Sequence, residues 1–260
     1  MAFNPQELII ERAKEVLFTD YSTENPLVRI TEVEDSTLEC TSENDEVTDA
    51  QGTPIDRIPR SKAATFSASG SFFNLGLAAL QFGAEKELAS AENKFVVPYF
   101  EVLKVDADAH TMTLSKTPVK GTVKVCPIAD KSIGEAMELA PSAPEQGQFS
   151  VSGTTVTLNE ADTGSFYVTY KFEAESGARV VNRADQFPET VGFRALVICK
   201  NVCNPNLKYL AIVEAKRAQL DATSISIAFR FDGKHPFTVN FNKEYCEEDA
   251  DLFTIYVIED

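Results

Sequence analysis

The fold is decided by residues 39–83, which read ECTSENDEVTDAQGTPIDRIPRSKAATFSASGSFFNLGLAALQFG. This stretch joins three segments of different character: a polar arm, a strand and a short helix. Within residues 43–60 few side chains are aliphatic, and Gly52, Pro54 and Pro59 disfavour a regular strand ladder. Connections of this length inside a domain are usually functional or disordered. We therefore interpret residues 43–60 as an extended contact arm, with a plain surface loop as the alternative.

The arm is followed by a strand and a helix. Apolar and small polar residues alternate over Ala64–Ser69, which predicts a half-buried strand. Ser69 or Ser71 can cap a short helix that begins there, and Gly83 supplies the left-handed stop. The apolar residues of this helix recur at helical spacing: Leu75, Ala78, Ala79 and Phe82.

The N-terminal residues predict a second helix. Asn4, Pro5 and Glu7 have the pattern of an N-cap, a first helical residue and the third residue of a capping box. Apolar residues lie on or near one face through about Phe18, so we expect an amphipathic helix over residues 4–18.

The rest of the chain is rich in strand patterns. Alternation is clearest over Phe166–Glu173, and it recurs over Ile225–Phe231, directly before the hairpin signal Asp232-Gly233. Residues 128–148 lose the pattern and are rich in Ala, Pro, Gly and Glu, which indicates a surface excursion.

These patterns predict a mainly β protein. Many short strands with one or two short helices and a long loop favour an antiparallel β-sandwich or a barrel-like subunit over alternating strand and helix units. We expect one domain over residues 1–260, and two β halves divided near residues 128–148 remain the alternative.

The charge balance limits the function. The 24 Lys and Arg residues against 40 Asp and Glu residues give a formal net charge of −16. Tight binding to DNA or to an anionic membrane requires the opposite sign, because Lys and Arg make the phosphate contacts. An acidic surface is compatible with DNA that slides past without capture, although solubility of an abundant protein explains the charge more simply.

The sequence carries no signature of catalysis, of a cofactor or of a metal site. The five cysteines are an odd number in a chain too large to need disulfides, which favours free thiols in a reducing cytosol. Cys199 and Cys203 lack the usual zinc spacing, and His110 and His235 are the only histidines. No segment approaches the ~20 apolar residues that span a bilayer, so we expect no membrane location. Because no catalytic motif is present, we also expect no enzymatic activity.

Residues 46–90, EVTDAQGTPIDRIPRSKAATFSASGSFFNLGLAALQFGAEKELAS, resemble the corresponding region of major tail tube proteins of long-tailed bacteriophages. Three later segments fit the same pattern with lower specificity: RVVNRADQFPETVGF, KYLAIVEAKRAQL and HPFTVNFNKEYC. The resemblance extends over most of the chain, from Val28 to Cys246.

This resemblance implies a structural virion protein. Its expected fold is a β-sandwich or barrel-like subunit with a helix and a long loop. The subunits are expected to form homo-oligomeric, hexameric rings that stack around a conduit for DNA ejection, with DNA passing through but not bound specifically. The implied partners are further tail proteins such as the tape measure and the tail terminator, and the implied location is the phage tail after synthesis in the host cytoplasm.

A binding module or a capsid decoration protein built on a β-sandwich is the alternative function. Its contact surface would consist of aromatic side chains such as Tyr99, Phe100, Tyr167 and Tyr170. Aromatic residues that alternate along strands are more often part of a core.

The arm is the predicted site of contact between subunits. Ile55 and Ile58 could anchor in a groove of a neighbour, while the two prolines lower the entropy lost on ordering. Basic residues near the end of the arm would meet acidic surface there. We expect the arm to be mobile in the free subunit and ordered in the assembly. The predicted contact residues are Gly52, Pro54, Ile55, Arg57, Ile58, Arg60 and Lys62.

Overall fold

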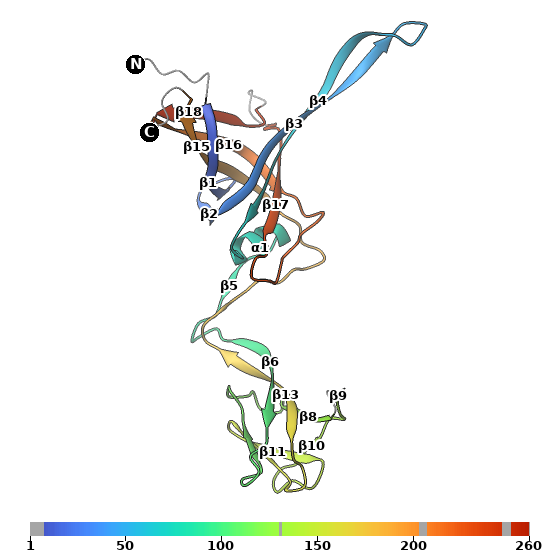
Figure 1. The fold of residues 1–260 in the computed structure, drawn as a ribbon, viewed down its shortest axis with the longest axis vertical. Coiled ribbons are helices and arrows are strands. Elements are labelled where there is room, and N and C mark those ends of the chain that lie inside the picture. Colours follow the sequence, from blue (N-terminus) through green and yellow to red (C-terminus); the bar gives the residue numbers. More distant parts are fainter. Residues whose placement is uncertain (1–7, 130–131, 203–206, 246–250, 260) are drawn as a thin grey trace. The chain divides into compact units, whose positions relative to one another are not determined.

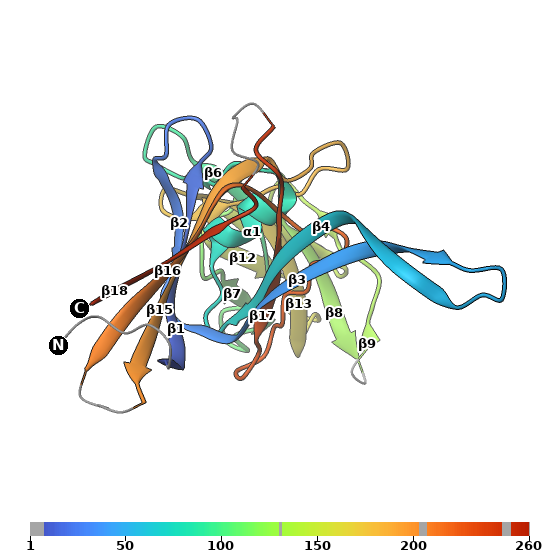
Figure 2. The same ribbon diagram turned by 90° about the horizontal axis from the view of Figure 1, so that it is seen from above.

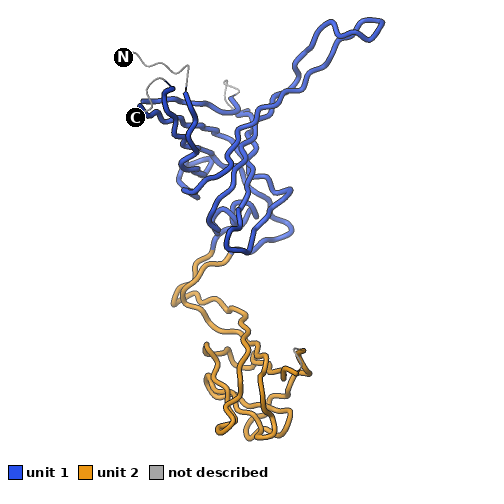
Figure 3. The backbone as a smooth tube through the Cα atoms, viewed as in Figure 1, with its two compact units in different colours: residues 1–86, 180–260 blue, residues 87–179 orange. Residues whose placement is uncertain are grey.

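The computed structural model describes residues 8–129, 132–202, 207–245 and 251–259, and it divides the chain into two compact units (Figure 3). Unit 2 comprises Glu87–Arg179, and unit 1 comprises the chain before and after it. Unit 2 is therefore an insertion into unit 1. Strand makes up 56% of the structure, which confirms the prediction of a mainly β protein.

Unit 1 is built on one curled, antiparallel sheet that forms a half-barrel (Figures 1 and 2). The strands follow the order β2-β1-β15-β16-β17-β4-β3, and β18 pairs with β16 off this path. Their bounds are β1 Leu8–Asp20, β2 Pro26–Ile30, β3 Val33–Thr48, β4 Pro54–Gly70, β15 Thr190–Asn201, β16 Lys208–Leu220, β17 His235–Phe241 and β18 Thr254–Glu259.

Aromatic side chains fill the core of unit 1. Phe193 has no exposed surface, and its ring centroid lies 4.9 Å from that of Phe66, 5.1 Å from that of Phe241 and 5.7 Å from that of Phe18. These rings come from β15, β4, β17 and β1, so a single residue joins strands from both ends of the chain. Tilted and edge-to-face pairs of this kind add to the free energy gained by burial.

The predicted N-terminal helix is wrong for the residues that the structure describes. Residues 8–18 belong to β1, which pairs with β15 on one side and β2 on the other, and residues 4–7 lie outside the described part. Register shifts after Ile10 and after Ala13 place extra residues in β1. Buried Ala13 and Val16 are consequently three residues apart, so β-bulges gave this strand the apolar spacing of a helix.

The helix predicted before Gly83 is confirmed as α1, Leu75–Phe82. It is capped by Asn74 and not by Ser69 or Ser71: the Asn74 Oδ1 accepts hydrogen bonds from the amides of Gly76 and Leu77. Gly83 ends the helix with a φ of 63°, as predicted.

Unit 2 contains two four-stranded sheets around its own core, in the orders β10-β11-β12-β7 and β6-β13-β8-β9. Phe149, Val156, Phe166 and Val168 are almost completely buried within it. The strand bounds are β6 Phe95–Lys104, β7 Thr111–Thr113, β8 Lys124–Ala129, β9 Ser132–Ile133, β10 Glu138–Leu139, β11 Gln148–Ser152, β12 Thr155–Leu158 and β13 Ser165–Ala174.

The two ends of unit 2 pair with each other. Strand β5, Glu87–Leu88, pairs with β14, Ala178–Arg179. The Arg179 guanidinium bonds to the Glu87 carboxylate at 2.7 Å and lies 4.8 Å from the centre of the Phe95 ring. We call this four-residue ladder with its ion pair the clasp.

The division between the units does not fall in the excursion at residues 128–148. That segment lies entirely inside unit 2, where its described part includes β9 and β10, so the alternative of two halves divided there is wrong. The expectation of one domain over residues 1–260 stays a prediction, because compactness does not measure whether the two units unfold together.

The strand predicted over Ile225–Phe231 is not formed. These residues belong to an irregular connection between β16 and β17, although their apolar and polar side chains alternate as in a strand. A segment with the alternation of a strand forms one only where a neighbouring strand is available to pair with it.

We expect the change Phe193→Ala to lower the free energy of unfolding by about 3–5 kcal/mol, because it removes the ring on which the core of unit 1 converges. Chemical denaturation followed by circular dichroism measures this loss. Phe187→Ala is the matched control, since that ring is 72% exposed, and its effect should stay within about 0.5 kcal/mol. Equal losses for the two variants would contradict the assigned core.

Candidate assembly surfaces

The arm is a regular β-hairpin formed by the distal parts of β3 and β4 (Figure 1). The prediction that its glycine and prolines prevent a ladder is wrong. Asn44 pairs with Pro59 and Thr48 pairs with Pro54, and a register shift accompanies each proline. The shifts leave Arg60 and Ile55 without a partner in the register, so β-bulges accommodate the prolines within the ladder.

The arm differs from the base of the same hairpin in its burial. In β4, Ala64, Phe66 and Ala68 are buried in unit 1, whereas every residue from Pro54 to Ala63 is exposed. Ile55 and Ile58 are 69% and 52% exposed, and both faces of the arm are open to solvent. A two-stranded hairpin without packing is only marginally stable in water.

Ion pairs within the arm hold its two strands together. Arg57 bonds to Glu46 at 3.0 Å, and Arg60 pairs with Asp45. We expect these two arginines to meet acidic surface on a neighbouring subunit. Such a contact would compete with their ion pairs inside the hairpin. Lys62 has no ion pair with a described residue. Exposed pairs of this kind contribute about 0–1 kcal/mol each.

Asp49 organises the turn at the tip of the arm. Its carboxylate accepts hydrogen bonds from the amides of Gln51 and Thr53, both at 2.8 Å, and these bonds lower the pKa of the carboxyl group. Gly52 adopts a φ of 84°, in the left-handed region that favours glycine. All seven predicted contact residues thus lie on this one hairpin.

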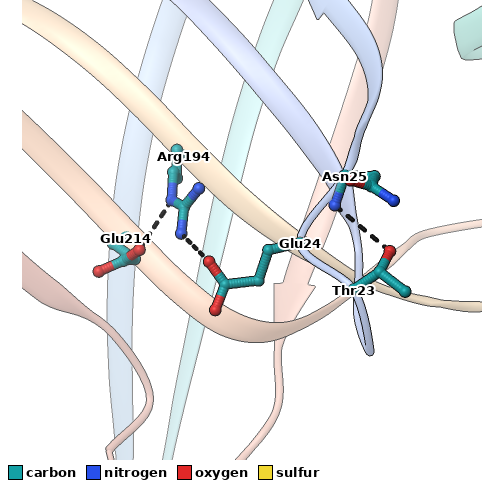
Figure 4. Close-up of polar contacts among 5 residues, drawn as sticks. All are labelled: Thr23, Glu24, Asn25, Arg194 and Glu214. Carbon is teal, nitrogen blue, oxygen red and sulfur yellow. Dashed lines mark hydrogen bonds and ion pairs between the residues drawn. The ribbon is translucent and has the colours of Figure 1, made fainter.

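A second polar cluster lies on unit 1, where Arg194 joins two acidic residues (Figure 4). Its guanidinium donates to Glu214 of β16 at 2.7 Å and to Glu24 of the β1–β2 turn at 2.9 Å. These bonds raise the pKa of Arg194. Sequence reasoning missed this cluster, because 170 residues separate Glu24 from Arg194.

The β1–β2 turn depends on Asp20. Its carboxylate accepts hydrogen bonds from the hydroxyl and amide groups of Ser22 and Thr23, at 2.7–3.0 Å. The hydroxyl of Ser22 contributes most to lowering the Asp20 pKa, which falls from 3.8 to about 2. The turn therefore favours the ionised carboxylate.

The aromatic residues of the alternative binding surface are divided between the core and the exterior of unit 2. Tyr170 is buried, and its hydroxyl donates to Glu101 at 2.8 Å. Tyr99 packs edge-to-face against Tyr170. Phe100 is 66% exposed and stacks on Tyr167 at 5.9 Å. The four residues do not form one surface.

The described part of the chain contains no cluster of His, Cys, Asp and Glu residues that could hold a metal ion. Cys40, Cys126 and Cys199 are free thiols, and Cys203 and Cys246 lie outside the described residues. Among the residues described, no helix is long and apolar enough to cross a membrane.

We expect the hydrogen bonds to Asp20 to be lost in acid. Because the folded pKa is below the ordinary value, this carboxylate stabilises the turn above pH 3.8, and the stabilisation disappears as the pH falls through about 2. An NMR titration of the Asp20 carboxyl group and of the Thr23 amide measures the transition. Asp20→Asn is the control without a titrating group, and a titration of Asp20 near 3.8 would contradict the prediction.

Comparison with known proteins identifies the family. No curated protein matches the chain significantly in sequence. The model of the YomU/Tube protein family, however, matches residues 8–250, which include the whole hairpin, the helix, all of unit 2 and unit 1 up to the segment before β18. The chain therefore belongs to the YomU/Tube protein family, a family of phage tail tube proteins.

Proposed function

We propose that the protein is a structural subunit that assembles with copies of itself into stacked rings, and that the stack forms the tail tube through which DNA is ejected. Family membership supports a structural, non-enzymatic role in a phage tail. The observation that carries the step to assembly is the arm, a long hairpin exposed on both faces. Hexameric rings and contacts with the tape measure and tail terminator are proposed from the family resemblance.

The arm has the properties of a contact between subunits. Its exposed Val47, Ile55 and Ile58 would gain free energy by burial against a neighbour. The strand pairing and the internal ion pairs of Arg57 and Arg60 favour the hairpin conformation, so less entropy is lost on docking than for an irregular loop. Exposed apolar side chains on a preformed hairpin thus support the assignment of residues 43–60 as a contact arm.

Ring closure would also protect the free edges of the unit 1 sheet. Strands β2, β18 and β3 each have only one strand partner among the described residues. Unpaired edges promote uncontrolled association, and a closed ring removes them while making a continuous wall. This constraint favours rings over isolated dimers.

Electron microscopy of the purified protein tests the assembly directly. Negative staining should show rings or tubes at high protein concentration. Small particles alone, even with other tail components present, would exclude self-assembly and favour a binding or decoration module. Light scattering over a concentration series provides an independent measure of particle size.

Replacement of residues 52–60 by a Gly-Ser linker should leave the subunit folded but unable to form tubes, because the linker removes the exposed isoleucines and the ladder together. The double change Ile55→Ser and Ile58→Ser should raise the critical concentration for assembly at least about tenfold, from the lost apolar burial. Sedimentation measures both effects.

The matched control is Ile133→Ser, which removes an isoleucine of unit 2 with 57% exposure and should leave the critical concentration within about twofold. Unimpaired tubes from the linker variant would show that the arm is only a surface loop. Protection of the arm amides from hydrogen exchange should rise on assembly, and equal protection in both states would count against docking.

The tube should have an acidic inner wall. A chain with a formal net charge of −16 can line a conduit without binding DNA, whereas Lys and Arg would gain affinity at every phosphate and slow its passage. A structure of the assembled tube provides the test through the charged residues that face the channel. A net positive wall would contradict this prediction.

A further inference from the structure

The connection between β16 and β17 is fixed at its two ends and unpaired between them. At the first end, the Asp221 amide donates to the Thr238 carbonyl at 2.8 Å. At the other end, Lys234 bonds to Glu34 at 3.0 Å and to Asp35 at 2.5 Å. The backbone of residues 224–229 makes no hydrogen bond with any described residue. The segment is thus held close to the sheet without belonging to it.

The side chains of this segment are those of a strand. Isoleucine and phenylalanine alternate with Ser226, Ala228 and Arg230, and two of the aromatic rings point into solvent: Phe229 is 93% exposed and Phe231 109% exposed. Neighbouring exposed apolar rings of this kind often mark an interaction site. A sequence with strand periodicity and no partner strand among the described residues fits a strand that pairs with another molecule.

We infer that residues 224–231 of one subunit add as a β-strand to the free edge of β18 in a second copy of the chain. This inference rests on the proposed self-assembly and names one pair of contacting elements. Addition of a strand would give the free backbone groups partners and would cover Phe229 and Phe231 at the same time.

The three strands of the unit 1 sheet that have one partner among the described residues are not equally suitable for pairing. Strand β2 begins at Pro26, and its Arg29 carbonyl already accepts a hydrogen bond from the Asn74 side chain at 3.3 Å. Strand β3 is lined with acidic residues, a common protection of an edge against pairing. Strand β18 lacks both kinds of protection, because residues 254–258 contain no proline and no charged side chain.

The surface and the charge of β18 complement the segment. Ile255, Tyr256 and Ile258 are 47–52% exposed, which suits contact with the two phenylalanines. Arg230 has an exposed ion pair with Asp232 at 3.4 Å, whereas acidic residues, Asp251 and Glu259, flank the apolar run of β18. Either acidic end of β18 can attract Arg230, so charge favours the contact without fixing its direction.

Hydrogen exchange on free subunits and on assembled particles tests the pairing. The amides of residues 224–229 should exchange freely in the subunit and gain at least about tenfold protection in the particle, together with amides of β18. Particles in which both segments stay unprotected would overturn this inference and leave the proposed function intact. Absence of any particle would overturn both.

A variant pair isolates the backbone contribution. Ser226→Pro removes an amide that has no partner among the residues the structure describes, so thermal unfolding of the subunit should be unchanged while the critical concentration for assembly rises at least about tenfold. Ser226→Ala keeps the amide and should assemble normally. Equal assembly of the two variants would contradict strand addition.

A synthetic peptide of residues 223–232 gives a second test that needs no mutant to fold. At excess it should slow tube growth and protect the amides of β18 in the free subunit, whereas a peptide of the same composition without alternation should do neither. Protection of β2 or β3 would assign the segment to another edge, and no protection anywhere would reject the inference.

Discussion

The pairing of β1 with β15 is the contact on which unit 1 depends. It joins residues 8–20 to residues 190–201, from opposite sides of the inserted unit 2, and it places Phe18 against Phe193 at 5.7 Å. The pairing of β4 with β17 makes a second connection of the same kind. Because both connections join distant parts of the chain, the loop-closure entropy must be overcome before the core contributes, which predicts slow folding relative to a protein with local contacts.

The sequence was most informative where one strand face is buried and the backbone is regular. Alternation in β13 and at the base of β4 identified both strands, and Gly83 correctly marked the end of α1. It was misleading in β1, since two bulges converted a period of two into helical spacing, and the prolines of the arm suggested an irregular loop because the same bulge geometry was not foreseen.

The candidate surfaces were predictable to different degrees. The exposure of the arm was predictable from composition, since a polar segment with few aliphatic residues cannot form a core, and its role as a subunit contact stays a prediction. The Arg194 cluster could not be found in this way, because its partners come together only through the sheet. Residues 224–231 are a third case. Their side chains alternate as in a strand, but the described residues provide no strand that pairs with them. Local preference and tertiary structure disagree there, as is common at functional surfaces.

The clasp between β5 and β14 has a consequence for how this chain can vary. An insertion whose first and last residues are paired presents a closed base to the rest of the protein, with Glu87 and Arg179 joined at 2.7 Å. The entropy of closing such a base grows only slowly with the length of the inserted chain. Unit 2 is therefore a position where whole modules can be gained, lost or exchanged without a change in the register of the unit 1 sheet. In evolutionary terms, the two units are free to diverge at different rates.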